Sequence, residues 1–289
     1  MKKILTWVSI LLSIAITCFW AFWGIIENFH EGWYYESFFQ NIGLMFLQYL
    51  SPMIIAMVLS LIAIRNHKIG ALIYLVSGAV FSYLVNNLTL SVPFIMMGLL
   101  FWFSKISDKK WKYRLSIILP LITLIIAGAE PIYRVSGRVN DGDFSMKLIQ
   151  GNEISLVWAP DGPGWPKDGM SWFDADSVCR YLNKDGLSLA HEPQNIWRLP
   201  SIEEATRTMI RHGKNSGGVL NENREPVYEI KPDKETPLWN PYSKVIYWWT
   251  STEIDDKQAY IIVYDGKIWK RNKNFSPNYL GFRAVKEAD

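Results

Sequence analysis

The sequence is poor in the residues that build disulfide frameworks and metal centres. It holds two cysteines and four histidines among 289 residues, and only Cys179 lies in the C-terminal half. A disulfide within that half is therefore excluded, and a fold there depends on its hydrophobic core. A single cysteine on the apolar stripe of a helix is typically a small buried residue, and we expect this role for Cys179.

Charge is missing from five apolar runs in the N-terminal part of the chain. None contains Asp, Glu, Lys or Arg before Glu130 at the end of the last run, and a helix needs about 20 apolar residues to cross the hydrocarbon core of a bilayer. We predict a membrane bundle of about five helices over residues 1–130. Its spans are 4–26, 42–64, 70–86, 88–104 and 115–130. The region 70–104 is also compatible with one span and a re-entrant segment.

Basic residues occur in only three places in this bundle, which are the N-terminus and two of the loops. They are Lys2, Lys3, Arg65, Lys68, Lys105, Lys109, Lys110, Lys112 and Arg114. Because Lys and Arg accumulate in cytoplasmic loops, five spans place every basic loop inside. We predict a multi-pass plasma-membrane protein with a cytoplasmic N-terminus and an extracellular or periplasmic C-terminal domain.

Apart from Glu130, at the outer end of the last span, the predicted spans contain no Asp, Glu, Lys or Arg, although such residues usually mark a transport path. The bundle is therefore typical of an anchor in the lipid bilayer or of an element that binds a membrane protein partner. The C-terminal part, in turn, lacks net charge, with 21 Lys and Arg against 22 Asp and Glu from Arg134 onward. This balance argues against nucleic acid as a partner.

Local signals in the C-terminal part predict an α+β domain. Ser171 and Asp174 resemble a capping box, and Ser201 with Glu204 forms a clearer one before a helix that we expect to end at Gly213. Strand patterns follow at the end of the chain, and Asp-Gly between two of them predicts a hairpin. The predicted strands are 195–199, 245–252, 259–264, 267–270 and 281–285. We predict that residues 215–243 form a long irregular segment, which we call the excursion.

Four separated motifs in this part resemble one known superfamily. They are Gly169–Ala175, Trp197–Glu204, Tyr247–Glu253 and Gly281–Val285. In this order they resemble the formylglycine-generating-enzyme-like (sulfatase-modifying factor) superfamily and the C-terminal domain of Legionella collagen-like proteins. The resemblance covers about residues 150–286 and implies a C-type-lectin-like fold. We place the domain at 150–289, after a linker at 131–149, and regard Arg198 and Glu204 as structural.

The chain departs from this superfamily at the position of its best-known chemistry. Formylglycine-generating enzymes bind copper through a cysteine pair near the C-terminal end of the domain, and residues 270–281 contain no cysteine. The resemblance therefore excludes that activity here, and we assign no catalytic residue. The alternative is a divergent metal-dependent oxidase, in which His191 and His212 would join a carboxylate as metal ligands. Both histidines also have simpler roles, one in a polar turn and one at a helix end.

Aromatic and polar residues instead gather in the segment where relatives of this fold bind ligands. The candidate ligand-binding residues are Trp269, Arg271, Asn272, Asn274, Phe275 and Tyr279. Rings for stacking beside amides and a guanidinium suit a saccharide or a peptide, although an ordinary loop closing the sheet has the same composition. The sequence thus predicts a membrane-anchored extracytoplasmic ligand-binding protein, a sensor or accessory subunit, whose domain is non-catalytic.

Three carboxylates lie close together after the predicted strand 245–252. Glu253, Asp255 and Asp256 offer the oxygen ligands that Ca²⁺ prefers. Acidic residues in a turn between strands are also commonly just solvated. Ca²⁺ is therefore the one cofactor for which the sequence offers a candidate site.

Overall fold

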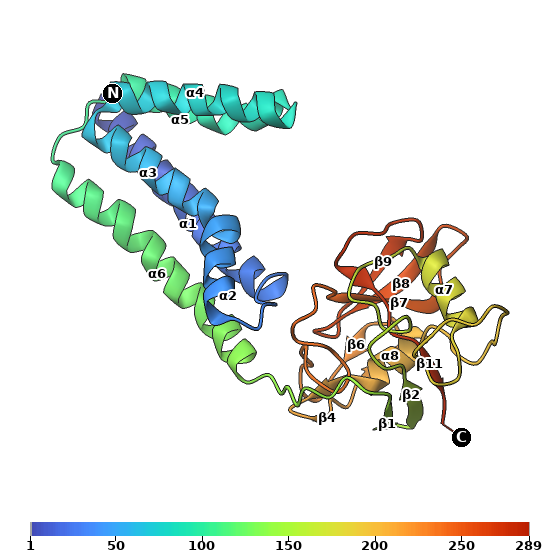
Figure 1. The fold of residues 1–289 in the computed structure, drawn as a ribbon. Coiled ribbons are helices and arrows are strands. Elements are labelled where there is room, and N and C mark those ends of the chain that lie inside the picture. Colours follow the sequence, from blue (N-terminus) through green and yellow to red (C-terminus); the bar gives the residue numbers. More distant parts are fainter. Residues whose placement is uncertain (1, 289) are drawn as a thin grey trace. The chain divides into compact units, whose positions relative to one another are not determined.

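The computed structural model describes residues 2–288 and divides the chain into two compact units. Unit 1 is Met1–Tyr133 and unit 2 is Arg134–Asp289. Unit 1 is helical, and unit 2 combines short helices with small, mainly antiparallel sheets, in which β10 and β7 pair in parallel (Figure 1). The predicted division into a helical N-terminal part and an α+β C-terminal part is confirmed. Each unit is described by itself below.

Unit 1 contains six α-helices and two short helical turns of other types within the described residues. The α-helices are α1 (Lys2–His30), α2 (Phe38–Leu44), α3 (Ser51–Arg65), α4 (His67–Val85), α5 (Val92–Phe103) and α6 (Lys109–Ser136). A π-helix, η1 (Met45–Tyr49), joins α2 to α3, and a 3-10 turn, η2 (Leu88–Ser91), joins α4 to α5. The last three residues of α6 already belong to unit 2.

Three helices among the described residues are long and apolar enough to cross a membrane. They are Lys3–His30, His67–Val85 and Lys109–Ser136, and a fourth span results if α2, η1 and α3, bent by 55°, count as one. By length, the described residues thus offer three or four spans, against the five predicted. Apart from the bent pair, the difference is α5, whose 12 residues extend about 18 Å, against a hydrocarbon core of roughly 30 Å.

The turn between α4 and α5 explains why the apolar pattern overstated the length of α5. Asn86 adopts a left-handed conformation with φ 52° and ends α4. The side chain of Asn87 then caps η2, which takes up residues 88–91 before α5 begins. These turn residues are uncharged, so the absence of charge does not distinguish them from the helix that follows.

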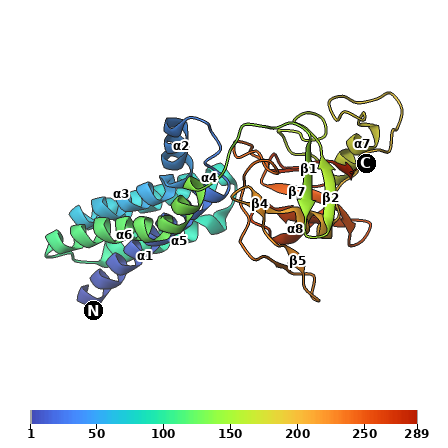
Figure 2. The ribbon, with the colours of Figure 1, turned by 90° about the horizontal axis from the view of Figure 1, so that it is seen from below.

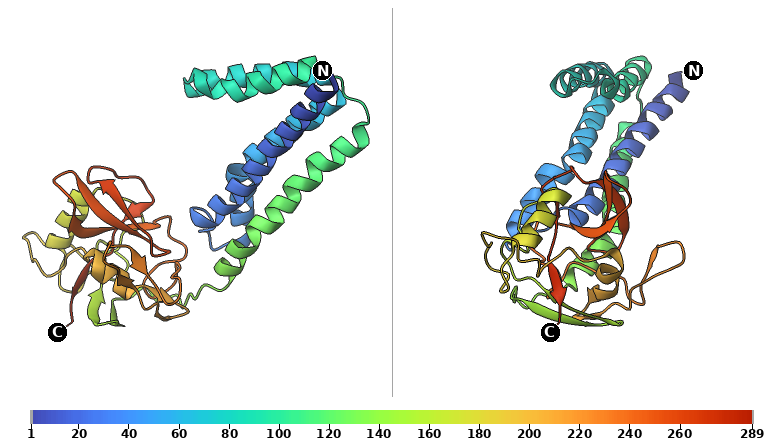
Figure 3. Two further views of the ribbon diagram at one scale, coloured as in Figure 1. Left: turned by 180° about the vertical axis from the view of Figure 1, so that it is seen from behind. Right: turned by 90° about the vertical axis from the view of Figure 1, so that its right-hand side faces the viewer.

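Helices α4 and α5 form a hairpin. The start of α4 and the end of α5 pack on the rest of unit 1 (Figures 1 and 3). Gly70 of α4 approaches Ala63 of α3 so closely that an added Cβ would lie 2.2 Å from the Ala63 Cα. Further along, the ring of Tyr74 stacks on Phe101 at 5.7 Å, and its hydroxyl lies 3.1 Å from Ser60 Oγ. Small and polar residues thus set the close approach of these helices.

Unit 2 is built around a four-stranded sheet in the order β10-β7-β8-β9, with a three-stranded sheet β1-β2-β11 beside it. The central strands are β7 (Tyr247–Glu253), β8 (Gln258–Val263), β9 (Ile268–Asn272) and β10 (Leu280–Gly281). The second sheet contains β1 (Lys147–Gly151), β2 (Ile154–Trp158) and β11 (Val285–Glu287) (Figure 2). Two small hairpins pair β3 (Ile210–Arg211) with β4 (Lys214–Asn215), and β5 (Val219–Leu220) with β6 (Pro226–Val227).

The core of unit 2 is rich in tryptophan, and both faces of β7 are covered. Trp248 stacks on Trp239 of the excursion with 3.6 Å between ring centroids, while Trp158 packs against Trp248 from β2. On the opposite face, Trp249 is fully buried and its Nε1 donates to the Met170 carbonyl at 2.8 Å. The excursion 215–243 is therefore an integral part of this core.

The two helices of unit 2 begin where the capping signals predicted. Ser171 accepts a hydrogen bond from the Asp174 N–H and opens α7 (Trp172–Tyr181), and a full capping box opens α8 (Ile202–Thr208). However, α8 ends before Gly213, because His212 and Gly213 both have positive φ and form the turn of the β3–β4 hairpin.

The N-terminal side of unit 2 is more ordered than predicted. The predicted linker 131–149 contains the end of α6 and most of β1, and Phe144 packs edge-on against Trp165 at 5.9 Å. The β1–β2 hairpin was missed. Its turn at Asn152 and Glu153, both with positive φ, is signalled by the Gly-Asn pair that precedes an alternating apolar pattern.

Candidate functional site

The predicted ligand-binding segment forms an aromatic surface beside the edge strand β9. Trp269 is 39% exposed and its ring lies 5.8 Å from that of Tyr247. Tyr247 meets Tyr279 edge-on at 5.5 Å, and Tyr279 meets Phe275 at 6.5 Å. The structure therefore brings three of the predicted aromatic residues together around Tyr247, a residue of the predicted strand 245–252 that is itself buried, with 5% exposed.

A guanidinium completes this surface. The Arg271 side chain lies over the Trp269 ring, with 5.0 Å between its central carbon and the ring centroid, and its Nη1 donates to the Lys270 carbonyl at 3.0 Å. We call Tyr247, Trp269, Arg271, Phe275 and Tyr279 the aromatic face. It combines stacking rings with an oriented cation, a combination typical of protein recognition surfaces.

The two predicted amides shape the turn that follows β9. Asn272 Oδ1 accepts from the Asn274 N–H at 2.9 Å, and the Asn272 carbonyl accepts from the Phe275 N–H at 3.0 Å. These bonds fix a tight turn with Phe275 exposed at 42%. Asn272 therefore acts chiefly on the shape of the turn, while Asn274 lies exposed beside Phe275.

Lys273, in the middle of this turn, is a buried cation. Its ammonium pairs with Glu253 and lies 4.7 Å from the Trp172 ring centroid and 5.7 Å from that of Phe173. Its carbonyl accepts from the Trp172 N–H at 2.9 Å. The turn is thereby attached to the start of α7. Because folding has already ordered this surface, a ligand does not lose affinity to ordering it.

The three predicted calcium ligands do not converge. Glu253 is engaged by Lys273, and Asp255 Oδ1 accepts from the N–H groups of Lys257 and Gln258, both at 2.7 Å. Within residues 2–288, no group of three or more His, Cys, Asp or Glu side chains is placed to hold a metal ion. The calcium prediction gains no support from this geometry.

The remaining candidates of the sequence are separated in the structure. His191 and His212 are both exposed, and neither belongs to a group of potential metal ligands among the described residues. Cys179 is fully buried, and burial raises the pKa of its thiol, so it is a core residue as expected.

Arg198 and Glu204 have the structural role expected of them. They form a two-pronged pair with both N–O distances at 2.7 Å, and Glu204 also accepts from the Ser201 N–H at 2.7 Å. Burial acts to raise the pKa of Glu204, but the hydrogen bonds and charge of Arg198 outweigh it and hold that pKa below its usual value.

Arg283, from the last motif, is a fully buried guanidinium without a carboxylate partner among the described residues. It donates to the carbonyls of Ala159, Pro237 and Leu238 at 2.6 to 2.8 Å, and it stacks on the Trp165 ring at 3.6 Å. It thus joins β2, the excursion and the C-terminal strands, and burial lowers its pKa.

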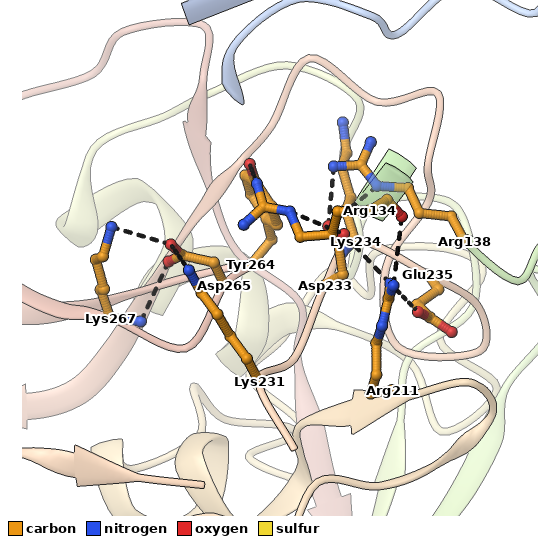
Figure 4. A network of polar contacts seen from close by, with 10 residues as sticks. All are labelled: Arg134, Arg138, Arg211, Lys231, Asp233, Lys234, Glu235, Tyr264, Asp265 and Lys267. Atoms are coloured by element: carbon orange, nitrogen blue, oxygen red, sulfur yellow. Dashed lines mark hydrogen bonds and ion pairs between the residues drawn. The ribbon is translucent and has the colours of Figure 1, made fainter. Parts of the chain in front are cut away.

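A buried ionic cluster, which the sequence did not predict, joins the start of unit 2 to the excursion (Figure 4). Asp233 has a fully buried side chain between three guanidinium groups. Its oxygens lie 3.4 Å from Arg134 Nε, 2.9 Å from Arg138 Nη2 and 3.3 Å from Arg211 Nη1. Arg211 Nη1 also donates to Glu235 Oε1 at 2.7 Å. Arg134 lies in the last turn of α6, so this cluster attaches the end of that helix to the folded domain.

Two further groups of the cluster have shifted titration. Burial lowers the pKa of Lys234 well below its usual value, and its ammonium donates to the Ser243 carbonyl. Burial raises the pKa of Glu235, and the charge of Arg211 offsets this only in part. Tyr264 packs beside the cluster, with its ring 5.4 Å from the Arg138 guanidinium. These groups stabilise the packing around Asp233.

Comparison with known proteins concerns the helical part. Residues 1–114 match the model of a family described as a domain of unknown function, DUF7670. This match ends within α6, at the end of its basic first turns, and does not extend to unit 2. A search of curated proteins finds no match to the chain. The comparisons therefore leave the function of the aromatic face to physical argument.

Proposed function

We propose that this chain is a membrane-anchored, extracytoplasmic ligand-binding protein whose aromatic face recognises a saccharide or a peptide without catalysis. The observation that carries this proposal is the aromatic face itself. Trp269 and Phe275 are exposed, and Arg271 and Tyr279 are held against them by ring contacts of 5.0 to 6.5 Å. A sensor or an accessory subunit of a membrane complex fits this arrangement.

For unit 2 we propose the formylglycine-generating-enzyme-like, C-type-lectin-like fold that the motifs resemble. In support, residues of these motifs hold unit 2 together through the Arg198–Glu204 pair, the buried Trp248 and Trp249, and the carbonyl-bound Arg283. The motifs also contact one another: Trp249 Nε1 donates to the Met170 carbonyl, and Arg198 pairs with Val285 through the backbone.

For the membrane part we propose a cytoplasmic N-terminus and an outer unit 2. An odd number of crossings separates the two ends if α1, the bent α2–α3 pair and α6 each cross the bilayer, because the α4–α5 hairpin then adds either two crossings or none. The hairpin runs from His67 to Phe103, with Lys68 at its start and Lys105 just after its end, so both basic flanks lie on one side whether it is two spans or a re-entrant pair. The orientation therefore does not depend on whether the hairpin crosses the bilayer.

A binding role fits the described side chains better than the alternative oxidase does. A metal-dependent oxidase needs several convergent ligands, and residues 2–288 offer no group of three. The aromatic face, in contrast, is fixed before any ligand arrives, because Lys273 attaches its turn to Trp172. No particular observation favours the oxidase.

The test is binding of the full chain, in lipid nanodiscs, to oligosaccharide and peptide arrays, followed by affinity measurement on the strongest probe. Replacing a central aromatic anchor typically costs about 2 kcal/mol, or roughly thirtyfold in Kd. We expect this loss for Trp269→Ala and for Phe275→Ala, and a smaller loss for Arg271→Lys, which keeps the charge but not the planar stack.

Tyr242→Ala is the matched control, because Tyr242 is 40% exposed but lies outside the aromatic face. It should bind as the unmodified chain does. Array binding that survives the loss of both Trp269 and Phe275 would place the site elsewhere. A chain that binds no probe on either array would defeat the proposed ligand classes.

A further inference from the structure

The basic residues of unit 1 gather at one end of its helices, although they come from three separate segments. Thr6 of α1 and Lys105 exchange hydrogen bonds of 3.0 and 3.1 Å, and Lys109 Nζ donates to the Arg65 carbonyl at 2.7 Å. The start of α1, the end of α5 and the start of α6 lie at this end (Figure 1). We call Arg65, Lys68, Lys105, Lys109 and Lys112 the basic collar.

This positive charge has no carboxylate partner among the described residues. Between residues 37 and 129 the sequence contains a single acidic residue, Asp108. Every ion pair described within residues 2–288 joins side chains of unit 2, and Lys109 and Lys112 donate only to backbone carbonyls. Four residues of the collar, Arg65, Lys68, Lys105 and Lys109, are exposed and available to an anion from outside the chain, whereas Lys112 is buried.

Tryptophan rings lie beside these cations. Lys68 Nζ is 5.8 Å from the Trp102 ring centroid, and Lys112 Nζ is 5.3 Å from that of Trp7. Both rings are about half exposed, at 45% for Trp102 and 48% for Trp7. Because tryptophan prefers the headgroup level of a bilayer, the collar lies at the depth where lipid phosphates are found.

The surface next to the collar is apolar on the lipid-exposed sides of the α4–α5 hairpin. Residues 69–104, between the collar's Lys68 and Lys105, contain no Asp, Glu, Lys or Arg. Their exposed side chains include Leu72, Val76, Val80, Ile95 and Leu99. A partner that contacts both the cations and this surface needs an anionic head and a hydrocarbon tail, which neither a nucleic acid nor an acidic protein provides.

We propose that the basic collar is a binding site for the headgroup phosphate of an anionic phospholipid in the leaflet on its side of the membrane. Arg65, Lys68 and Lys109 supply the charge, and Trp102 lies at the glycerol level beside the acyl chains. Near a membrane surface each such cation strengthens the attraction to anionic lipid several-fold, and the effects multiply. The site thus selects phosphatidylglycerol over phosphatidylcholine. This inference is independent of the aromatic face.

The test is competition between the two lipids for the full chain in mixed micelles, with bound lipids counted by native mass spectrometry. We expect the unmodified chain to prefer phosphatidylglycerol, and the triple variant Arg65→Gln, Lys68→Gln, Lys109→Gln to lose that preference by about tenfold or more. The charge-conserving variant Arg65→Lys, Lys68→Arg, Lys109→Arg should retain most of it. The triple variant Lys184→Gln, Lys214→Gln, Lys257→Gln removes equal charge from exposed positions of unit 2 and should retain it fully.

A second measurement needs no variant. Raising the salt from about 0.1 M to about 1 M shortens the screening length from about 10 Å to about 3 Å, and it should remove the preference of the unmodified chain. The proposal fails if the preference survives high salt, or if the collar variant and the unit 2 variant behave alike. It also fails if millimolar inorganic phosphate displaces phosphatidylglycerol, because the collar then binds free phosphate and not a lipid.

Discussion

Replacing Asp233 with Asn should destabilise unit 2 more than any other single loss of charge. The Asp233 side chain is fully buried, and three guanidinium groups lie 2.9 to 3.4 Å from its oxygens. Removing one partner of a buried ion pair costs about 3–5 kcal/mol, because the remaining charges stay buried without compensation. Asn still accepts the 2.7 Å hydrogen bond from the Lys234 N–H, so we expect a loss near about 3 kcal/mol.

For a domain of this size, a loss of that magnitude lowers Tm by roughly 6–12 °C. The measurement is urea and thermal unfolding of the full chain in nanodiscs, followed by near-ultraviolet circular dichroism. The stacked rings of Trp239 and Trp248, 3.6 Å apart, provide a signal specific to the core of unit 2. The helical unit contributes little to that signal change if it stays folded in lipid.

Asp256→Asn is the matched control, because Asp256 is exposed and forms no described ion pair. Its effect should stay within about 0.5 kcal/mol. If Asp233→Asn also costs less than about 1 kcal/mol, the three arginines do not depend on that carboxylate. The reasoning from the buried cluster would then be wrong.

Three further predictions concern unit 2. Because the pKa of Glu204 is lowered, its contribution to stability is complete above about pH 4.5 and is lost as pH falls through the pKa of the folded state. In urea unfolding, Glu204→Gln should therefore reduce the loss of stability at acid pH. An unchanged loss would show that other carboxylates cause it. Trp239→Ala should cost about 3–5 kcal/mol by removing the stack on Trp248, whereas Trp239→Phe should cost clearly less; equal losses would contradict the packing argument. Cys179 should resist iodoacetamide in the folded chain and react in urea, since burial raises its pKa, and rapid alkylation of the folded chain would contradict this.

Local signals in the sequence predicted local structure well. The caps at Ser171 and Ser201 involve residues three positions apart, so the pattern that forms them is contiguous and readable. The hairpin turn at Asp265–Gly266 was predicted for the same reason, and Gly266 has the positive φ of 84° that this turn requires. Each of these features is decided within a few residues of chain.

Features that depend on distant partners were not predictable. Asp233 meets Arg134 and Arg138 across about a hundred residues, and nothing in the polar excursion indicates that its acids are buried. Tyr247 belongs to the predicted strand 245–252 but was not a ligand-binding candidate; it is buried, with 5% exposed, and it supports the aromatic face through contacts with Trp269 and Tyr279. Side chains of one strand end either inside or outside according to which segments cover the sheet, and that covering is a tertiary property.

The span count shows the same limit in the membrane part. Apolar composition identified all the helices that can enter a bilayer, but it did not separate α5 from the uncharged turn before it. This turn contains Asn, Leu, Thr and Ser but no charged residue, so the sequence pattern does not mark it as a break between helices. Whether a helix can cross the bilayer depends on its length, and the length is set by the residues at which the backbone turns.

The pairing of β2 with β11 has a consequence for how the protein is made. Trp158 pairs with Val285, and Arg198 bridges the same residue, so the second sheet of unit 2 lacks its outer strand until the final residues of the unit have been synthesised. During translation, β1 and β2 emerge more than a hundred residues before their partner and present an unpaired edge. Nascent chains of unit 2 should therefore stay protease-sensitive until β11 has left the ribosome, and ribosomes stalled before Val285 should yield unit 2 in a degradable state.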